Sequence, residues 1–358
     1  MNPLQGGVAV ITGAASGFGL EASRIAAGLG MKVVMADVQA DALARAQHEI
    51  EALGAEVLPF RLDVSRAAEV EALGAATMGR FGAPNFVFNN AGVGAGGLIW
   101  ENTAKDWEWV VGVNLMGVAH GLRVFTPLML AAAKKDPAWR GDIVNTASMS
   151  GLINAPISGV YNATKHAVVS MSETLYHDLA LVTDQVHAHV LCPFFVPTGI
   201  HESARNRPGT LADGAPPTRS QLVAQATTGQ AVNKGKVSAA QVAGFVFDAC
   251  AENRFYIFSH PKSLVSVQTR LEDVMLSRNP TDPFADPGKP IQAGVATKAP
   301  YSLLLRAEQD TLVCRATLPD LSVVEITEQD SDLTEGGLAL FTAGASAQFE
   351  RVKACTHD

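Results

Sequence analysis

The first feature of the sequence that can support chemistry is a tyrosine followed four residues later by a lysine. They are Tyr161 and Lys165, in the stretch SGVYNATKHAV (158–168). Side chains four residues apart lie on the same face of a helix. The phenol of a free tyrosine has a pKa of about 10, which is too high for it to act as a base at neutral pH. A neighbouring ammonium group lowers the pKa of a phenol. The pair is therefore either a solvated pair on an ordinary helix or a phenol prepared to release its proton.

A glycine-rich segment near the N-terminus has the pattern of a nucleotide-binding turn. The segment is ITGAASGFGL (11–20), in which Gly13, Gly17 and Gly19 flank Ser16 and Phe18. Glycines let the backbone approach a pyrophosphate, and the start of the following helix supplies amide donors and a positive dipole end. A glycine-rich turn without a ligand is the alternative. The position between a strand pattern and a helix pattern favours dinucleotide binding.

Asp37 stands at the end of the next apolar run and bears on the choice of dinucleotide. A carboxylate there accepts hydrogen bonds from both ribose hydroxyls of NAD and repels the 2′-phosphate of NADP. Neither Ser16 nor Val38 offers a cation to such a phosphate. An aspartate that caps the next turn is the alternative. The sequence favours NAD over NADP.

Apolar runs that alternate with Ala-rich helical patterns place these residues in a fold. We predict strands at 7–12, 32–37, 56–64, 85–92, 141–148 and 186–193, and helices at 18–30, 41–53, 66–80, 113–134 and 161–182. The strand runs are apolar almost throughout, as strands covered on both faces must be. The alternation predicts an α/β protein with a doubly wound parallel sheet, a Rossmann fold. Such sheets bind ligands at the carboxyl ends of their strands.

The pattern changes after the sixth predicted strand. Residues 198–237 are rich in Gly, Pro, Thr and Asn, with a short polar helix among them, and we expect a lid that closes over substrate. A helix at 238–252, a strand at 254–258 and a helix near 262–278 follow, before the linker-like RNPTDPFADPGKP (278–290). We therefore expect a catalytic domain at 1–290, including its lid.

Residues 291–358 form a C-terminal extension with a β-type pattern. Its strand-like segments are YSLLLRA, TLVCRATL, SVVEITE, GGLALFTA and SAQFERVKA. Four alternatives are open for the extension. It packs on the main domain, adds strands to an oligomer, reaches the pocket of a neighbouring subunit, or is partly disordered. We expect it to be dispensable for the chemistry, because every candidate cofactor and catalytic residue precedes residue 199.

Six motifs taken together resemble those of the short-chain dehydrogenase/reductase (SDR) family. They are TGAASGFG (12–19), LDV (62–64), NNAG (89–92), Asn114 in VGVNLMG, NTASMSG (145–151) and YNATK (161–165), in the family's order and at its spacing. The resemblance covers roughly residues 5–275. It implies an NAD-dependent enzyme that interconverts a hydroxyl and a carbonyl group.

The resemblance also implies roles for individual residues. Tyr161 is expected to be the acid/base, and Lys165 to lower its pKa and hold the nicotinamide ribose. Ser148 would donate to the substrate oxygen, and Asn114 would position a water in a proton relay to Lys165. Along the cofactor, the resemblance places Asp63 and Val64 beside the adenine, Asn90 along the adenosine ribose, and Val196 and Thr198 at the nicotinamide end.

One position departs from the family pattern. The family commonly has Pro-Gly after the sixth strand, whereas CPFFVPT (192–198) has Phe194 in place of the glycine. Phe194 and Phe195 either narrow the pocket or belong to the core. For three tryptophans that follow the fourth strand, packing against helices or an oligomer partner is favoured over substrate contact; they are Trp100, Trp107 and Trp109.

The amino-acid composition and the net charge indicate which classes of protein the chain can belong to. Of the 358 residues, 47% are apolar and 17% charged, which is typical of a globular protein. A net charge of −8 without a long basic run disfavours nucleic acid and anionic membranes as partners. No continuous apolar run approaches the roughly 18 residues of a membrane span. The N-terminal segment lacks a signal-peptide pattern, so we expect a cytoplasmic protein.

The sequence predicts neither a disulfide frame nor a metal site. Its four cysteines, Cys192, Cys250, Cys314 and Cys355, are scattered without CxxC spacing and are expected to be reduced thiols. The residues that could suggest a metal site do not present four ligands at plausible spacing; they are His187, His189, His201 and Glu202.

Two hypotheses for the function stay open at this level. The leading one is an NAD-dependent dehydrogenase/reductase for a secondary alcohol or ketone. Similarity of ESARNRP (202–208) and RFYIFSHP (254–261) to bacterial enzymes that oxidise the α-carbinol of lignin-derived aryl ethers suggests an aromatic or bulky substrate. The alternative is a catalytically silent dinucleotide-binding sensor or scaffold. By the resemblance we expect a homo-oligomer, a tetramer or a dimer, paired through the apolar segments 113–134 and 161–182.

Overall fold

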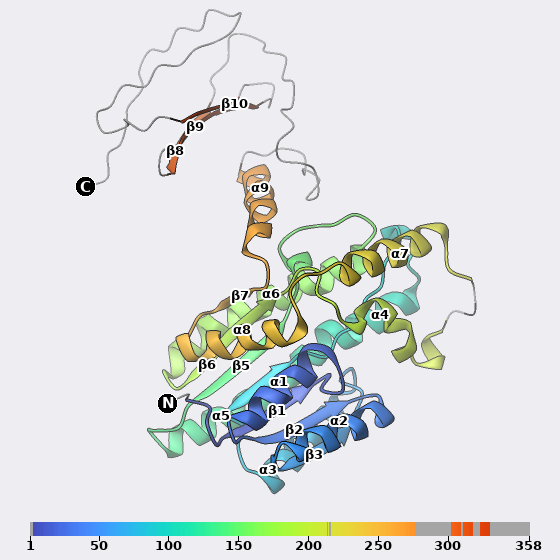
Figure 1. The fold of residues 1–358 in the computed structure, drawn as a ribbon, viewed down its shortest axis with the longest axis vertical. Helices are drawn as coiled ribbons and strands as arrows, with labels where there is room; N and C mark the ends of the chain where they lie inside the picture. The colour runs from blue at the N-terminus through green and yellow to red at the C-terminus, as the bar shows by residue number, and fades with distance from the viewer. Residues whose placement is uncertain are drawn as a thin grey trace, which may run out of the picture. The chain divides into compact units, whose positions relative to one another are not determined.

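The computed structural model describes residues 3–212, 214 and 216–275, and the backbone alone at 302–308, 311–317 and 323–329. The chain divides into two compact units. The first runs from the N-terminus through Val274, and the second contains the last three strands (Figure 1). Each unit is described by itself.

The first unit is built on a seven-stranded parallel sheet in the order β3-β2-β1-β4-β5-β6-β7. The strands are β1 (Val8–Thr12), β2 (Lys32–Asp37), β3 (Val57–Arg61), β4 (Phe86–Asn89), β5 (Gly141–Thr146), β6 (Val186–Cys192) and β7 (Tyr256–Phe258). Every residue of β1, β4 and β5 is buried, as their apolar runs predicted. The strand order reverses between β1 and β4, where sheets of this kind form a ligand crevice.

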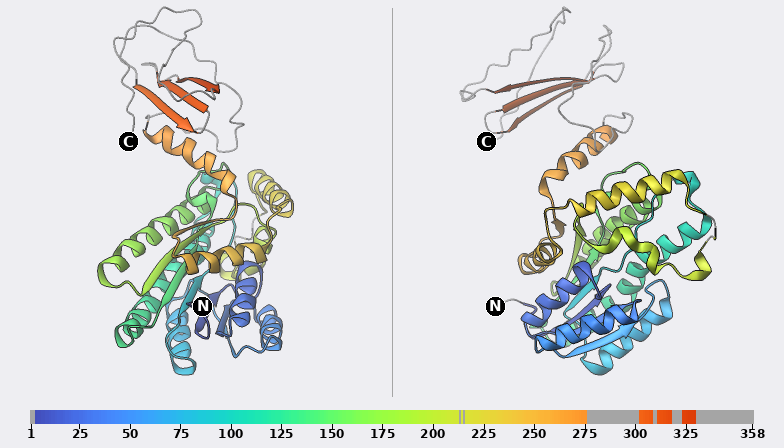
Figure 2. Two further views of the ribbon diagram at one scale, coloured as in Figure 1. Left: turned by 60° about the vertical axis from the view of Figure 1, so that its left-hand side comes forward. Right: turned by 45° about the vertical axis from the view of Figure 1, so that its right-hand side comes forward.

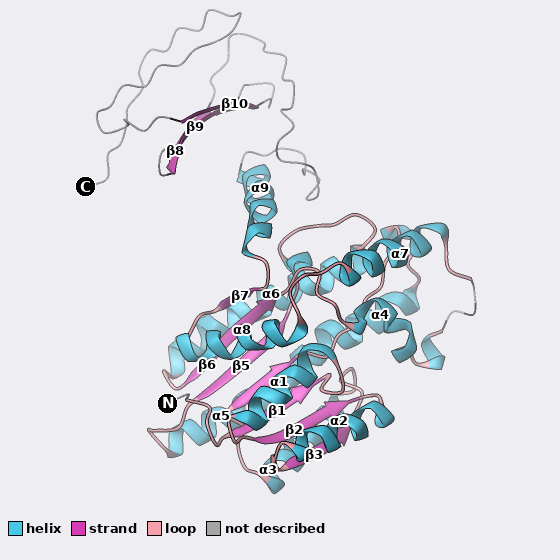
Figure 3. Cartoon of the chain, in the orientation of Figure 1, coloured by secondary structure: helices cyan, strands magenta, loops and turns pink. Residues whose placement is uncertain are grey.

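Helices cover both faces of this sheet (Figure 3). The described helices are α1 (Gly17–Gly28), α2 (Ala40–Ala52), α3 (Ala67–Arg80), α4 (Ala104–Val111), α5 (Gly117–Lys135), α6 (Gly159–Val182), α7 (Arg219–Asn233), α8 (Ala239–Glu252) and α9 (Leu264–Met275). Helices α1, α2 and α8 share one core cluster with the sheet, and α3, α5 and α6 share another. The predicted doubly wound Rossmann fold is confirmed.

The segment before α5 is more helical than the sequence predicted. Helix α4 begins after Thr103, whose hydroxyl accepts a hydrogen bond from the Asp106 amide, while the Asp106 carboxylate accepts one from the Thr103 amide. A π-helical turn, η2 (Gly112–Met116), then joins α4 to α5 and contains Asn114. Such turns are frequent at functional sites.

The continuous helical run Ala104–Lys135 is unusually apolar. By length and composition it could cross a membrane, and it is the one such helix among the described residues. Core helices of soluble proteins pass the same test, and Phe125 and Met129 of this run pack under the sheet with no exposure. Only 28% of the run's apolar window is buried. Much of its apolar surface therefore has no cover among the described residues.

The lid predicted at 198–237 contains more regular structure than its composition indicated. It holds two 3₁₀ segments, η4 (Gly199–Asn206) and η5 (Gly209–Leu211), and the fifteen-residue helix α7. Thr218 and Gln221 form a capping box that starts α7. Helices α7 and α4 lie at the same end of the first unit in every view (Figures 1 and 2).

The second unit contains an antiparallel sheet in the order β10-β9-β8. Its strands are β8 (Ser302–Glu308), β9 (Thr311–Thr317) and β10 (Val323–Gln329), close to three of the predicted strands. The other two predicted strands, at 336–343 and 346–354, lie outside the described residues. The role of the extension stays a prediction.

Candidate active site

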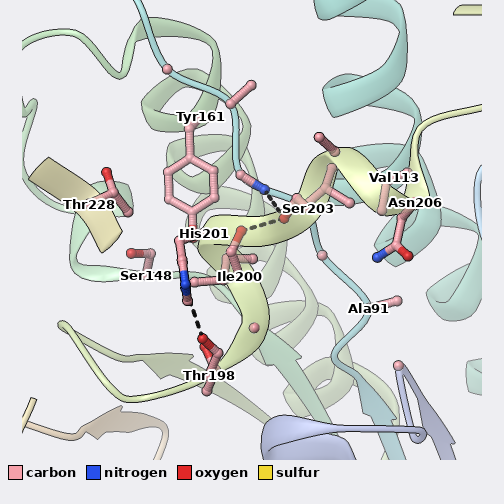
Figure 4. Close-up of a pocket in the computed structure, with 18 of the residues that line it drawn as sticks. Ala91, Val113, Ser148, Tyr161, Thr198, Ile200, His201, Ser203, Asn206 and Thr228 are labelled. Carbon is pink, nitrogen blue, oxygen red and sulfur yellow. Dashed lines mark hydrogen bonds between the residues drawn. The ribbon is translucent and has the colours of Figure 1, made fainter. Parts of the chain in front are cut away.

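A cavity of about 940 Å³ lies at the carboxyl ends of the central strands. Its walls come from the glycine-rich loop after β1, the loops after β2, β3 and β4, the segment from β5 to α6, and the lid. Figure 4 shows Tyr161 and Ser148 with the lid residues Thr198, His201 and Ser203. All the predicted site residues line this cavity except Gly19 and Asn114.

The glycine-rich loop needs its glycines for steric reasons. Gly13 has a φ of +65°, and a Cβ atom there would lie 3.0 Å from Cα of Ala91. A Cβ at Gly19 would lie 2.2 Å from the Gly13 carbonyl oxygen, closer than any real contact. The loop is therefore folded tightly onto the start of α1, with its backbone open to the cavity. This shape fits a pyrophosphate at the helix N-terminus.

Asp37 lies at the end of β2 with its carboxylate held in place. Its Oδ2 accepts a hydrogen bond from the Ala15 amide at 3.1 Å, and its Oδ1 accepts one from the Gln39 amide at 2.9 Å. Each oxygen keeps a further lone pair for a ribose hydroxyl. Arg61 pairs with Asp37 in the sheet register, and its Nε lies 3.4 Å from the Val38 carbonyl oxygen. The sequence analysis missed this neighbouring cation, which does not itself line the cavity.

Tyr161 and Lys165 both point from the first turns of α6 into the cavity. Lys165 is 3% exposed, its ammonium donates to the Thr146 carbonyl oxygen at 2.8 Å, and it lies 5.6 Å from the centre of the Tyr161 ring. Burial lowers the pKa of Lys165 to about 8. The solvated-pair alternative is wrong for Lys165.

The pKa of Tyr161 moves in the opposite direction from the one expected. Burial raises it, and a hydrogen bond with Ser148 opposes that rise. Ser148 is itself buried, and its hydroxyl oxygen accepts a hydrogen bond from the Ser150 amide at 3.1 Å. Because the Lys165 ammonium bonds to Thr146 and not to the phenol, its charge does not outweigh burial. The cavity thus pairs a phenol with a hydroxyl, as an acid/base pair for an alcohol oxygen requires.

Comparison with known proteins fits this geometry. The family model described as short chain dehydrogenase matches residues 7–209. The chain belongs to the short-chain dehydrogenase/reductase family. A dehydrogenase/reductase of CLA biosynthesis from Lactiplantibacillus plantarum is 33% identical over 78% of this chain and 97% of its own length. This SDR is thus an oxidoreductase of a family whose dehydrogenases act on hydroxyl groups.

Two further relatives of this SDR bear on its cofactor and its substrate. A short chain dehydrogenase/reductase from Burkholderia phymatum, solved in complex with NAD, is 53% identical with a TM-score of 0.77, covering 80% of this chain and 100% of that one. A C alpha-dehydrogenase from Sphingobium is 29% identical over 79% of this chain and 90% of its own length. The SDR site therefore fits a nicotinamide dinucleotide.

Asn114 is buried in the π-helical turn η2, and its side chain bonds to the loop after β4. Its Oδ1 accepts from the Val93 amide at 2.8 Å and its Nδ2 donates to the Val93 carbonyl oxygen at 2.9 Å. Gly92 lies between Asn114 and Lys165, with its Cβ position 3.4 Å from Oδ1 and 3.7 Å from Nζ. Asn114 thus clamps the loop after β4, and its role in a proton relay stays a prediction.

The other predicted cofactor residues are held by the core of the SDR. The Asp63 carboxylate accepts hydrogen bonds from the amide and the hydroxyl of Ser65, and Val64 packs against Gly117. Asn90 donates its side-chain amide to the Thr12 carbonyl oxygen at 3.0 Å. Their side chains therefore shape the cavity wall, while contacts with a bound nucleotide stay predictions.

Phe194 belongs both to the cavity and to the core. It lines the cavity with Phe195, whose ring centre lies 4.6 Å away, and it packs on the cluster around β6. The two alternatives for Phe194 therefore both hold in part. Among the tryptophans, Trp109 is 5% exposed and lines the cavity, whereas Trp100 is 76% exposed. Trp109 packs in a core cluster with Val110 and Val160 and also lines the cavity, so both alternatives stay open for it, and an oligomer contact of Trp100 stays a prediction.

Side chains of the lid join it to the core at several places. The Ser203 hydroxyl oxygen accepts a hydrogen bond from the Gly94 amide at 2.9 Å. Arg207 forms an ion pair with Asp106 at 2.6 Å and lies 5.4 Å from the ring of Trp109. These partners lie about a hundred residues apart in the chain. Sequence reasoning singled out the segment with Arg207 but had no signal for its partner.

A buried cluster of titratable groups, which the sequence analysis did not predict, lies away from the cavity. The potential ligand atoms of Asp142, His189 and Cys250 all lie within 4.8 Å of one another. His189 Nε2 is 2.8 Å from Asp142 Oδ1, and Nδ1 is 2.9 Å from the Arg254 carbonyl oxygen. Because a carbonyl can only accept, His189 Nδ1 donates to Arg254, and we interpret the cluster as a buried, hydrogen-bonded pair of His189 and Asp142. Cys192 and Cys250 are buried free thiols, while Cys314 and Cys355 lie outside the described side chains.

Proposed function

We propose that this SDR transfers a hydride between NAD(H) and the carbinol carbon of a secondary alcohol or its ketone, with Tyr161 as the acid/base. The observation that carries the proposal is that Tyr161, Ser148 and buried Lys165 line the same cavity as the glycine-rich loop and Asp37. One cavity thus holds the groups for proton transfer and those for a dinucleotide.

The residues divide the work of the oxidation between them. Ser148 donates a hydrogen bond to the substrate oxygen and holds it next to the Tyr161 phenol. Tyr161, as the phenolate, takes the hydroxyl proton as the carbon–hydrogen bond breaks, and the oxygen becomes a carbonyl. The nicotinamide ring, when bound, accepts the hydride. Lys165 adds positive charge near the phenolate and so favours its formation once a cofactor and substrate fill the cavity.

We propose that Asp37 selects NAD over NADP. Asp37→Ala should weaken NAD binding and lower the preference for NAD, measured as kcat/KM for NAD divided by kcat/KM for NADP. The substitution removes both the acceptor for the ribose hydroxyls and the charge that repels the 2′-phosphate. Arg61, on the neighbouring strand, would then meet a 2′-phosphate without a competing carboxylate. Steady-state kinetics with both cofactors measure the change. Asp41→Ala, at an exposed carboxylate of α2, is the matched control, and a wild type that prefers NADP would contradict the assignment.

We propose an aromatic or bulky hydrophobic substrate. Apolar side chains at the lid end of the cavity include Ile157, Phe195, Ala224 and Ala231, and they lie beside polar lid residues such as Gln221, Gln225 and Thr228. The cavity lies near the upper end of the usual ~300–1,000 Å³ range for ligand sites, and it must hold both a dinucleotide and a substrate. Similarity to the Sphingobium C alpha-dehydrogenase supports this substrate class.

A screen tests the proposed function. Secondary alcohols and ketones, including aryl carbinols, are offered with NAD(H) and in parallel with NADP(H), and NADH absorbance is followed. We expect turnover of at least one bulky secondary alcohol with NAD. Tight NAD binding without turnover of any compound would favour the silent sensor instead.

We also propose that the SDR is a homo-oligomer, most simply a tetramer. The run Ala104–Lys135 leaves most of its apolar window uncovered, and α6 exposes Leu181 and Val182 at 83% and 67%. A second copy would cover such helices. Light scattering at micromolar concentration should give a mass of two or four chains, and a single-chain mass would contradict the proposal. A cytoplasmic location stays a prediction.

A further inference from the structure

The pyrophosphate of a dinucleotide carries two negative charges, and the loop that approaches it supplies no basic side chain. Residues 12–19 are TGAASGFG, without Lys, Arg or His. Backbone amides and the N-terminus of α1 can meet part of this charge. A cation from elsewhere in the fold would complete the site.

Among the described residues, four basic side chains line the cavity: Lys165, His201, Arg205 and Arg207. Lys165 bonds to the Thr146 carbonyl oxygen at the catalytic end. Arg207 is paired with the buried carboxylate of Asp106. His201 Nδ1 lies 3.2 Å from the Thr198 carbonyl oxygen (Figure 4). Arg205 has only an exposed acidic neighbour, Glu202, at 3.8 Å.

Arg205 is held against the part of the lid that faces the glycine-rich loop. Its Nη1 donates to the Gly199 carbonyl oxygen at 2.8 Å, and a Cβ atom at Gly199 would lie 2.8 Å from its Nη2. The guanidinium therefore lies on the bare backbone of Gly199. The preceding residue, Thr198, places its methyl group 3.6 Å from the Cβ position of Gly17. The guanidinium of Arg205 thus lies on Gly199, the residue next to the contact between Thr198 of the lid and Gly17 of the loop.

We propose that Arg205 is a further cofactor-binding residue, whose guanidinium pairs with the pyrophosphate when the lid lies over the glycine-rich loop. Guanidinium groups suit this role because their fork of donors matches two phosphate oxygens. The inference rests on the proposed dinucleotide cofactor and adds a lid residue to its site.

The test compares ADP with adenosine, which differ only in the phosphates, and measures NAD beside them. Dissociation constants of NAD, ADP and adenosine are measured by calorimetry for the wild type, Arg205→Gln and Arg205→Lys. Arg205→Gln should weaken ADP and NAD by about ten- to hundredfold and leave adenosine unchanged, because a hydrogen bond to a charged group is lost only with phosphates. Arg205→Lys should recover part of the loss, and the salt dependence of ADP binding should be shallower for Arg205→Gln.

Arg219→Gln is the matched control, because Arg219 is an exposed arginine of the same lid that does not line the cavity. It should bind all three ligands like the wild type. Unchanged ADP affinity in Arg205→Gln, or an equal loss for ADP and adenosine, would overturn the role of Arg205. A wild type that binds neither NAD nor ADP would instead overturn the proposed cofactor, so the two failures are distinguishable.

Discussion

Tyr161→Phe should lower kcat for alcohol oxidation by about 10²–10⁴-fold while NAD binding stays close to that of the wild type. The substitution removes only the ionisable oxygen, and general acid–base groups contribute rate factors of this size. The ring keeps its packing, so the cavity that binds the cofactor is unchanged. The loss should fall on kcat and kcat/KM alike, since the proton transfer occurs in the transition state.

The pH profile gives this prediction a second readout. The wild-type rate of oxidation should rise with pH on the alkaline side of neutrality, because Tyr161 must lose its proton and burial raises its pKa. The residual rate of Tyr161→Phe should lack that rise. Tyr176→Phe, at an exposed tyrosine of the same helix, is the control and should behave like the wild type. A Tyr161→Phe variant with more than about a tenth of the wild-type kcat would remove Tyr161 from this role.

Asp142→Ala should destabilise the protein by about 3–5 kcal/mol, the second large effect that we expect. Asp142 and His189 are 2% and 0% exposed, and the substitution leaves the buried imidazole Nε2 without its partner at 2.8 Å. Urea unfolding should show a lower midpoint with an unchanged slope. Asp184→Ala, at an exposed aspartate just before β6, should change the midpoint little. A loss below about 1 kcal/mol for Asp142→Ala would contradict a stabilising role for this buried pair.

The sheet was predictable because its signal is local. Runs such as GVAVIT and KVVMAD are apolar on both faces, and only strands covered by helices on both sides bury such runs. The glycine-rich loop and the Tyr161–Lys165 pair were predictable for the same reason, since each depends on spacing within one element. All of them lie where the sequence placed them.

What the sequence could not show depends on contacts between distant segments. The direction of the Tyr161 pKa shift depends on burial and on the bond of Lys165 to Thr146, which no spacing reveals. The pairing of Arg207 with Asp106 joins residues of the lid and of α4. The helix at 104–111 was missed although Thr103 and Asp106 have capping-box spacing, because its eight residues are fewer than the about 11 over which helical periodicity is read.

The most direct test of the central claim is to follow the hydride itself. A secondary alcohol found in the screen is labelled with deuterium at the carbinol carbon and oxidised with unlabelled NAD, and the recovered NADH is analysed by mass spectrometry. The account predicts one deuterium per NADH, because the hydride passes directly from the carbinol carbon to the nicotinamide while Tyr161 takes the proton. NADH without deuterium would contradict direct hydride transfer and the function proposed for this cavity.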